Sequence, residues 1–265
     1  MRRTVSSRLD LTVTEPADLV FSVAVAADLG PTEETLAVTV DGEPVETTEI
    51  VDGTTRLHRI ASAPVGRLTL AYDAVVPEGE PTGPVTDLEA IVFTRPSRYC
   101  DSDRLSAVAH AHFGDLAGEE LVQAVVSWAL THITYAPGAS GPVDGALETY
   151  LSRLGVCRDT SQLVITFLRA LGVPARLVSV YAPGLVPMDF HAVTEVALDG
   201  RWYVVDGTGL APRSSLVRIA TGRDAADTAF LTVNSGRASM GPMTVTATAD
   251  PGLPADDGLA LTRLR

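Results

Sequence analysis

The sequence predicts an α+β protein, because its hydrophobic periodicity changes twice along the chain. Apolar residues alternate with polar ones from residue 1 to about 95, which is the period of a half-buried β-strand. From residue 115 the apolar spacing becomes that of amphipathic helices, and β-type alternation returns at 176–206. Strands, then helices, then strands are typical of the α+β class.

The first stretch predicts an antiparallel, β-sandwich-like domain over residues 1–95. Alternating apolar residues occur in three short runs: 9–13, 38–40 and 68–70. Asp-Gly dipeptides at 41–42 and 52–53 lie between such runs, and this dipeptide favours hairpin turns whose central residues need positive φ. A segment rich in Pro and Gly, 77–84, leads to one more expected strand at 88–94.

The middle of the chain predicts three helices. The first carries an apolar stripe up to Ile133 and opens with two glutamates at 119–120, which suit the positive end of a helix dipole. A short helix is expected at about 146–154. The third carries apolar residues from 163 to 171 and is ended by Gly172 and Pro174.

Three strands follow, at 176–181, 191–198 and 201–206. Asp199-Gly200 separates the last two and predicts a hairpin in which the numbers of paired residues sum to 399. This register places Asp206 diagonal to His191 on one face, close enough for an imidazole to meet a carboxylate, unless a bulge interrupts it.

Beyond residue 208 the signals weaken. One strand is expected at 243–248, and the tail at 249–265, rich in Pro, Gly and Asp, is expected to be mobile.

The composition excludes several functions. The 265 residues include no lysine, which excludes Schiff-base and pyridoxal-phosphate enzymes and the lysine of a Walker A loop. A net charge of −13 argues against binding nucleic acid or docking on an anionic membrane. With no recognisable signal peptide, no apolar run long enough to span a bilayer and only two cysteines, we expect a cytoplasmic, reduced protein.

Cys157 is the first candidate catalytic residue, because it lies at the start of the third predicted helix. Residues 159–162 fit a capping box, which places the N-cap at Asp159 and Cys157 just ahead of it. Alternatively, the helix begins at Cys157 itself. In both cases the sulfur lies near unpaired backbone N–H groups and the positive end of the helix dipole, which favour a thiolate. Position alone fits a nucleophile and a buried structural cysteine equally well.

His191 favours the catalytic interpretation. The predicted hairpin sets His191 beside Asp206, and a cysteine at a helix start with such a pair is an arrangement for thiolate catalysis. The carboxylate orients the imidazole ring, and the ring takes or shares the thiol proton. The sequence therefore predicts Cys157, His191 and Asp206 as a catalytic triad.

The motifs around these residues resemble those of the bacterial transglutaminase-like superfamily, which shares a papain-like Cys-His-Asp core. They are Gly155-Val156-Cys157-Arg158-Asp159, Asp189-Phe190-His191-Ala192 with Glu195-Val196, and Asp206-Gly207-Thr208. The similarity extends to residues 95–100 and 222–227, so that it covers about 95–235. The β-rich front matches the N-terminal domain often joined to that core.

The resemblance implies a papain-like, transglutaminase-like core at 96–248, with helices packed on an antiparallel sheet, between the β domain at 1–95 and the tail at 249–265. It also implies roles: Cys157 is the nucleophile, His191 the general base and acid, and Asp206 the orienting carboxylate.

Three departures from the family pattern lie beside the site. Val193 stands where an aromatic residue is usual, and Gly207 stands where a proline is common. Thr160-Ser161 replaces an aromatic–alanine pair. None of the three removes a member of the triad.

We therefore expect a cysteine enzyme that acts on amide or peptide bonds through a thioester, by hydrolysis rather than cross-linking. The alternative is a catalytically inactive transglutaminase-like domain that serves as a binding or scaffolding module. A peptide or protein amide is the expected substrate. No cofactor is expected, and the sequence does not indicate an oligomeric state.

Other candidate residues are given structural roles. His110 and His112, with Asp101 and Asp103 nearby, lack a third ligand at a recognisable spacing, so no metal site is expected. Cys100 is expected to be structural. Trp128 and Tyr135, at helical spacing, are expected in the core, and the segment 185–190 is either a wall of the substrate cleft or a plain connection.

Overall fold

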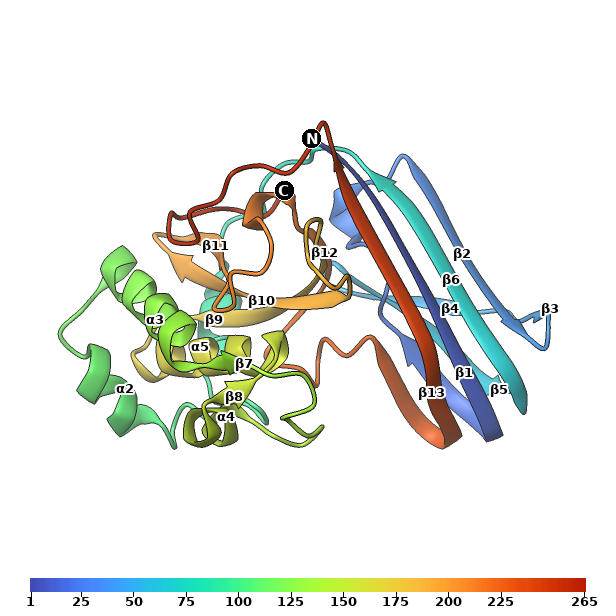
Figure 1. The fold of residues 1–265 in the computed structure, drawn as a ribbon, viewed down its shortest axis with the longest axis horizontal. Helices are drawn as coiled ribbons and strands as arrows, with labels where there is room; N and C mark the ends of the chain where they lie inside the picture. The colour runs from blue at the N-terminus through green and yellow to red at the C-terminus, as the bar shows by residue number, and fades with distance from the viewer.

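A curled antiparallel sheet forms one side of the molecule in the computed structural model, which describes residues 1–265 (Figure 1). Its strands follow the order β3-β2-β6-β1-β5-β4, with β13 added beside β1. The strands are β1 (Arg2–Phe21), β2 (Glu33–Val40), β3 (Glu43–Pro44), β4 (Thr48–Asp52), β5 (Thr55–Ala63), β6 (Gly66–Val76) and β13 (Leu231–Asp250).

β1 is the organising strand of this sheet. One edge of β1 pairs with β6 over its first half and with β5 near its end, and the other edge pairs with β13 along the whole strand. Because β13 comes near the end of the chain and returns to β1, the first sheet is built from both ends of the chain.

A second antiparallel sheet lies between the first sheet and the helices (Figure 1). Its order is β11-β10-β9-β12, from β9 (Ala175–Tyr181), β10 (Phe190–Leu198), β11 (Arg201–Val205) and β12 (Val217–Gly222). The helices are α1 (Asp87–Val92), α2 (Ser106–Phe113), α3 (Gly118–His132), α4 (Ala146–Ser152) and α5 (Cys157–Ala170). Short elements complete the fold: parallel β7 (Thr134–Tyr135) and β8 (Leu154–Gly155), and the 3-10 turns Ala27–Leu29 and Arg213–Ser215.

Two large hydrophobic cores explain this layering. In the first, the apolar face of the first sheet packs against the second sheet through side chains such as Tyr181 and Ile219. In the second, α2, α3 and α5 pack on the second sheet, on its side away from the first, with Phe167 of α5 in contact with Phe113 and Trp128. The antiparallel sheet and its helical cover are the α+β architecture that the sequence predicts.

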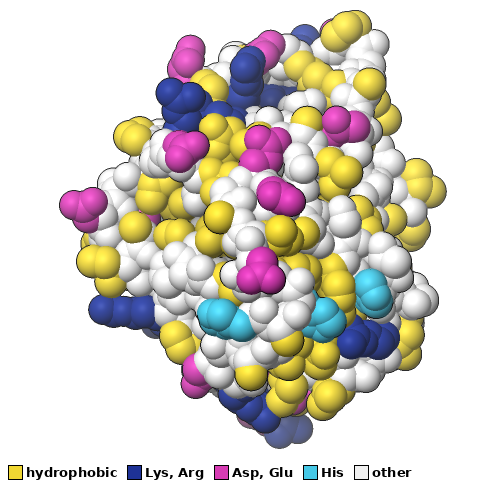
Figure 2. All heavy atoms as spheres, turned by 90° about the vertical axis from the view of Figure 1, so that its left-hand side faces the viewer, with side chains coloured by type: hydrophobic (Ala, Val, Ile, Leu, Met, Phe, Trp, Pro, Cys, Tyr) yellow, Lys and Arg dark blue, Asp and Glu magenta, His cyan; other side chains and the backbone are white.

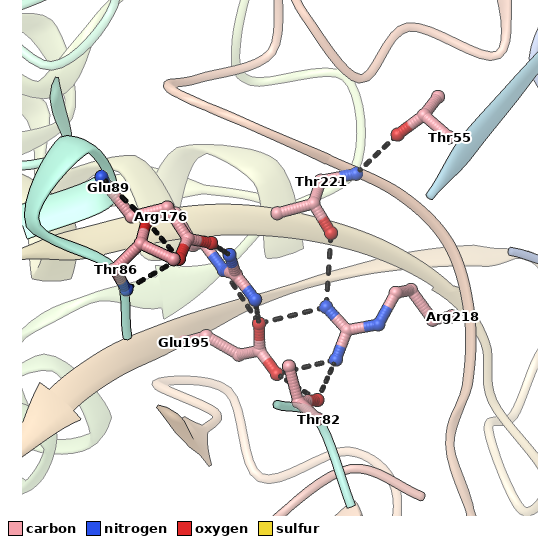
Figure 3. Close-up of polar contacts among 8 residues, drawn as sticks. All are labelled: Thr55, Thr82, Thr86, Glu89, Arg176, Glu195, Arg218 and Thr221. Atoms are coloured by element: carbon pink, nitrogen blue, oxygen red, sulfur yellow. Dashed lines mark hydrogen bonds and ion pairs between the residues drawn. The ribbon is translucent and has the colours of Figure 1, made fainter. Parts of the chain in front are cut away.

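A buried ion-pair cluster fixes β10 to its neighbours (Figure 3). Glu195 of β10 is fully buried and accepts hydrogen bonds from Arg176 of β9, at 2.8 Å, and from Arg218 of β12, at 2.6 and 2.9 Å. Arg176 also donates to Glu89 of α1, and Arg218 donates to Thr82. The cluster therefore joins three strands to the segment that leads from the first sheet.

The segment 88–94 corrects one sequence prediction, since it forms helix α1 rather than a strand. Thr86 and Glu89 make a reciprocal capping box: the Glu89 N–H donates to Thr86 Oγ1 at 3.2 Å, and the Thr86 N–H donates to Glu89 Oε2 at 2.9 Å. The capping signal Thr-x-x-Glu outweighs the apolar content that favoured a strand.

The C-terminal part differs from the prediction in two ways. The strand expected at 243–248 is part of β13, so that residues 231–250 lie in the first sheet rather than in the core. The tail, expected to be mobile, lies against the core: Asp256 accepts hydrogen bonds from the buried Arg213, and Leu264 is buried beside Val204. A salt bridge and an apolar anchor outweigh the composition of the tail.

No helix of the structure is both long and apolar enough to cross a membrane. On the face at the α2 and α3 end, charged side chains of both signs are scattered among apolar ones and imidazoles (Figure 2).

We predict that Glu195→Gln lowers the free energy of unfolding by about 3–5 kcal/mol, because it leaves the buried guanidinium of Arg218 without its counter-charge and that of Arg176 with only the partly exposed Glu89. Urea denaturation measures this loss. Glu15→Gln is the matched control, since Glu15 forms an exposed pair with Arg237 that we expect to contribute less than about 1 kcal/mol. Equal, small losses for both variants would contradict the prediction.

Candidate active site

Cys157 is the first residue of α5, which decides between the two helix starts considered above. The N-cap is Val156, and its N–H donates to Asp159 Oδ2 at 2.8 Å, so Asp159 caps from the third helical position. The first N–H groups of a helix have no acceptor within it. The half-buried Cys157 sulfur therefore lies at the positive end of the helix dipole.

Arg158 holds the loop that precedes α4 against the start of α5. Its guanidinium donates to Asp159 Oδ1 at 2.7 and 2.9 Å, and also to Ser140 Oγ and the Gly141 carbonyl. The fully buried carboxylate of Asp159 neutralises the charge of Arg158, because the two side chains form an ion pair. Arg158 is thus a positioning group for the wall beside Cys157 rather than an uncompensated cation.

The β10–β11 hairpin has the predicted register. Its five pairs run from Leu198 with Arg201 to Thr194 with Val205, and every pair sums to 399. Asp199 and Gly200 both have positive φ, 48° and 72°, as the turn requires. Asp206 follows the end of β11, and its Oδ2 accepts a hydrogen bond from His191 Nε2 at 2.9 Å.

Thr208 completes the carboxylate's environment. The Thr208 N–H and hydroxyl donate to Asp206 Oδ1 at 2.8 and 2.6 Å, so that each carboxylate oxygen has its own partners. These bonds and His191 outweigh the effect of burial and lower the pKa of Asp206. The sequence prediction assigned Thr208 no role, although Asp-x-Thr after a strand is a recognisable side-chain-to-backbone turn.

Cys157 and His191 face the same cavity. His191 Nδ1 is buried and has no hydrogen-bond partner, while Nε2 is committed to Asp206. Burial lowers the pKa of His191, but the hydrogen bond and charge of Asp206, together with the neighbouring Cys157 sulfur, outweigh burial and raise it to about 10. Nδ1 is therefore the nitrogen available for proton exchange with the thiol.

Ser161 joins the nucleophile's helix to the histidine's strand. Its hydroxyl donates to the Ala192 carbonyl at 2.9 Å, and Thr194 Oγ1 donates to the Ser161 carbonyl at 3.2 Å. The two hydrogen bonds join α5, one turn after Cys157, to β10 at one and three residues after His191. In the sequence, Ser161 was visible only as a departure from the family pattern.

The two outer segments that resemble the family meet at Arg169 near the end of α5. This buried side chain donates to the Arg95 carbonyl, to Ser97 Oγ and to the Arg223 carbonyl. The Tyr99 N–H donates to Asp224 Oδ2 at 2.9 Å between the same two segments. The segments 95–100 and 222–227 are therefore a structural clasp around the helix that carries Cys157.

The cavity that contains Cys157 and His191 has a volume of about 590 Å³. Asp189 and Phe190 contribute to its lining, so part of the segment 185–190 is a cavity wall, while Leu185 is buried elsewhere. A second cavity, of about 850 Å³, lies around Arg176 and Arg218. The guanidinium groups of these two residues are already bound to Glu195.

The remaining candidate residues lie outside the cavity that contains Cys157 and His191. Cys100 is fully buried, and burial raises the pKa of its thiol to about 12. His110 and His112 lie on helix α2, where His110 Nδ1 bonds to the Ser106 carbonyl. The expectation for Tyr135 was wrong: it lies on β7, is 45% exposed, and its raised pKa reflects burial together with the nearby charge of Cys157.

Comparisons with known proteins agree on one family. The model of the transglutaminase-like superfamily matches residues 108–207, which include Cys157, His191 and Asp206. The crystal structure of a "putative cysteine protease" from Cytophaga hutchinsonii is 30% identical, with a TM-score of 0.86, and the alignment covers 98% of this chain and 96% of that one.

A curated protein also matches in sequence. An uncharacterized protein of Mycobacterium leprae (strain TN) is 28% identical over 157 residues, which are 54% of this chain. The alignment spans 55% of that relative, about half of its length.

We predict that stability depends on pH through His191. A group whose pKa is raised by folding stabilises the fold fully below its unfolded pKa, near 6.5, and this stabilisation is lost as the pH rises toward its folded value of about 10. The free energy of unfolding should therefore fall across this window in the wild type, and less steeply in His191→Gln. Urea denaturation at several pH values measures both slopes.

The control for this prediction is His110→Gln, because His110 lies on α2 with its ring exposed and away from Asp206. Its pH dependence should match that of the wild type. Parallel curves for the wild type and His191→Gln would contradict the prediction.

Proposed function

Because this chain belongs to the transglutaminase-like superfamily, we propose that it is a cysteine-dependent acyl-transfer enzyme that cleaves amide or peptide bonds. One observation carries the proposal: His191 is bonded to Asp206 through Nε2 and presents an uncommitted Nδ1 in the cavity that also holds Cys157. A thiol at a helix start beside an oriented imidazole is the arrangement that nucleophilic catalysis requires.

In the proposed reaction the Cys157 thiolate attacks the amide carbonyl carbon while its proton resides on His191. Breakdown of the tetrahedral intermediate breaks the C–N bond, and the leaving amine takes the proton from His191 Nδ1, which leaves a thioester on Cys157. A water molecule then attacks the thioester, gives one proton to His191, and releases the carboxylic acid as the proton returns to the sulfur. Asp206 keeps the ring oriented through both steps.

The oxyanion of the tetrahedral intermediate needs donors near the sulfur. We propose the N–H groups of the first turn of α5, including that of Cys157, because they have no acceptors within the helix.

Hydrolysis is proposed over cross-linking. The supporting observation is the similarity over nearly the whole chain to the C. hutchinsonii protein, whose description is that of a cysteine protease. A catalytically inactive scaffolding domain is the alternative, motivated by the departures at Val193, Gly207 and 160–161. The hydrogen bond of Ser161 supports the enzyme over the inactive domain, since the Ser161 hydroxyl helps to hold β10 beside α5.

We predict that Cys157 is alkylated by iodoacetamide at about pH 6 at least about tenfold faster in the wild type than in His191→Ala. An ordinary thiol has less than about 1% thiolate at this pH, whereas an imidazolium with a raised pKa stabilises the thiolate beside it. Mass spectrometry of the labelled peptide measures the rate, and buried Cys100 is expected to remain unlabelled.

His110→Ala is the matched control and should react like the wild type. If Cys157 reacts no faster than a free thiol and His191→Ala changes nothing, the inactive scaffold is the better description.

We predict that water outcompetes amines for the thioester. With an activated acyl ester as donor and glycine amide at millimolar concentration, the free acid should be the main product by mass spectrometry. Cys157→Ala should form neither product above the uncatalysed rate. Predominant formation of the amide would identify a transamidase instead.

A further inference from the structure

The cavity beside Cys157 is built by both sheets. Leu177 of β9 and Ile219 of β12 come from the second sheet, and Leu231 and Met243 of β13 come from the first. Phe190 of β10 packs against both Tyr181 and Phe230, at ring-centroid distances of 5.5 and 5.4 Å. The first sheet is therefore a wall of the site, in addition to packing against the core.

The lining is mostly apolar, and its charges are few. Of the 20 residues that line the cavity, 12 are hydrophobic. Apart from His191, only Arg158 and Asp189 are charged, and Arg158 is already paired with Asp159. Asp189 is an exposed residue of the lining, and partial burial of its carboxyl raises its pKa. An anionic ligand group would lose its hydration here without gaining a free guanidinium, because Arg158 is paired with Asp159.

Two hydroxyls in the lining have no partner. Ser22 directly follows the last residue of β1 and lines the cavity. It is 2% exposed, and its Oγ makes no hydrogen bond. Ser179 Oγ of β9 is likewise buried and unbonded. Both oxygens are closed off from solvent, so the lining offers a ligand mainly apolar surface.

From these observations we infer that the cavity binds the acyl side of the substrate, and that the preferred acyl group carries no negative charge, is largely apolar and is as large as an aromatic side chain. The volume of about 590 Å³ exceeds what an acetyl group would fill and lies within the range of ligand pockets. This inference rests on the proposed function, since it names the substrate class for the Cys157 thioester. β13 is then part of the specificity pocket.

The first experiment measures acylation of the full chain by p-nitrophenyl esters of four acids: acetic, 4-phenylbutanoic, 4-(4-hydroxyphenyl)butanoic and glutaric. Each rate is divided by that of N-acetylcysteine with the same ester, which corrects for the reactivity of the ester. We expect the two aryl esters to react about tenfold or more faster than the acetate, because the cavity removes the ring from water. The normalised rate of the anionic glutarate ester should not exceed that of the acetate.

Variants on one strand locate the effect. Met243→Trp fills the cavity and should reduce the ratio of the phenylbutanoate rate to the acetate rate to nearly one. Met240→Trp is the matched control, because Met240 is on the same strand, is 40% exposed and lies outside the cavity. Ala226→Leu, on an exposed part of the cavity wall, narrows the site with less risk to folding and should reduce the same ratio.

A binding measurement separates this inference from the proposed function. Isothermal titration of Cys157→Ala with 4-phenylbutanamide requires no catalysis; we expect saturable binding that acetamide and glutaramate lack and that Met243→Trp abolishes. If the amide binds in this way but no ester acylates Cys157, the proposed function fails and the pocket stands. If acylation occurs at equal normalised rates for all four esters, or the glutarate reacts fastest, the inferred substrate class is wrong. Absence of selective binding to Cys157→Ala also overturns it.

Discussion

The register of the β10–β11 hairpin is the constraint on which the site depends. A slip of one residue would turn His191 to the opposite face of the sheet and break its bond to Asp206. The turn at 199–200 sets this register. Glu195, on the same strand as His191, fixes β10 to its other neighbours, because it is bonded to Arg176 of β9 and Arg218 of β12. The imidazole is therefore oriented by the sheet before any substrate arrives.

Each of the two sheets contributes a different part of the site. The second sheet and α5 hold Cys157, His191 and Asp206, whereas the first sheet supplies part of the cavity wall through β13. Because β13 follows the second sheet in the chain but pairs with β1, the chain crosses between the two sheets at 77–86 and again at 223–230, and the sheets also share one hydrophobic core. The apolar cavity lies at this junction.

The sequence predicted the features that depend on residues close together in the chain, such as a hairpin register and a helix start. The Asp199-Gly200 turn fixed a register that the structure reproduces pair by pair, and a helix start at Cys157 was one of two stated alternatives. The strand expected at 88–94 failed because an apolar run was weighted above the capping pair of Thr86 and Glu89. A strand at 243–248 was expected, but its pairing with β1 could not be foreseen, since it joins residues more than 200 positions apart and no turn specifies it.

Two of the three departures from the family pattern are coupled to each other. A Cβ at position 207 would come within 2.8 Å of the Thr160 methyl and 3.1 Å of Val164, so glycine after Asp206 leaves room for Thr160. Ser161, next to Thr160, uses its hydroxyl to hold β10 to α5. Residues that are separate in the sequence thus form one contact between the helix of Cys157 and the strand end of Asp206. Gly207 and the pair at 160–161 are therefore explained by packing between these two elements.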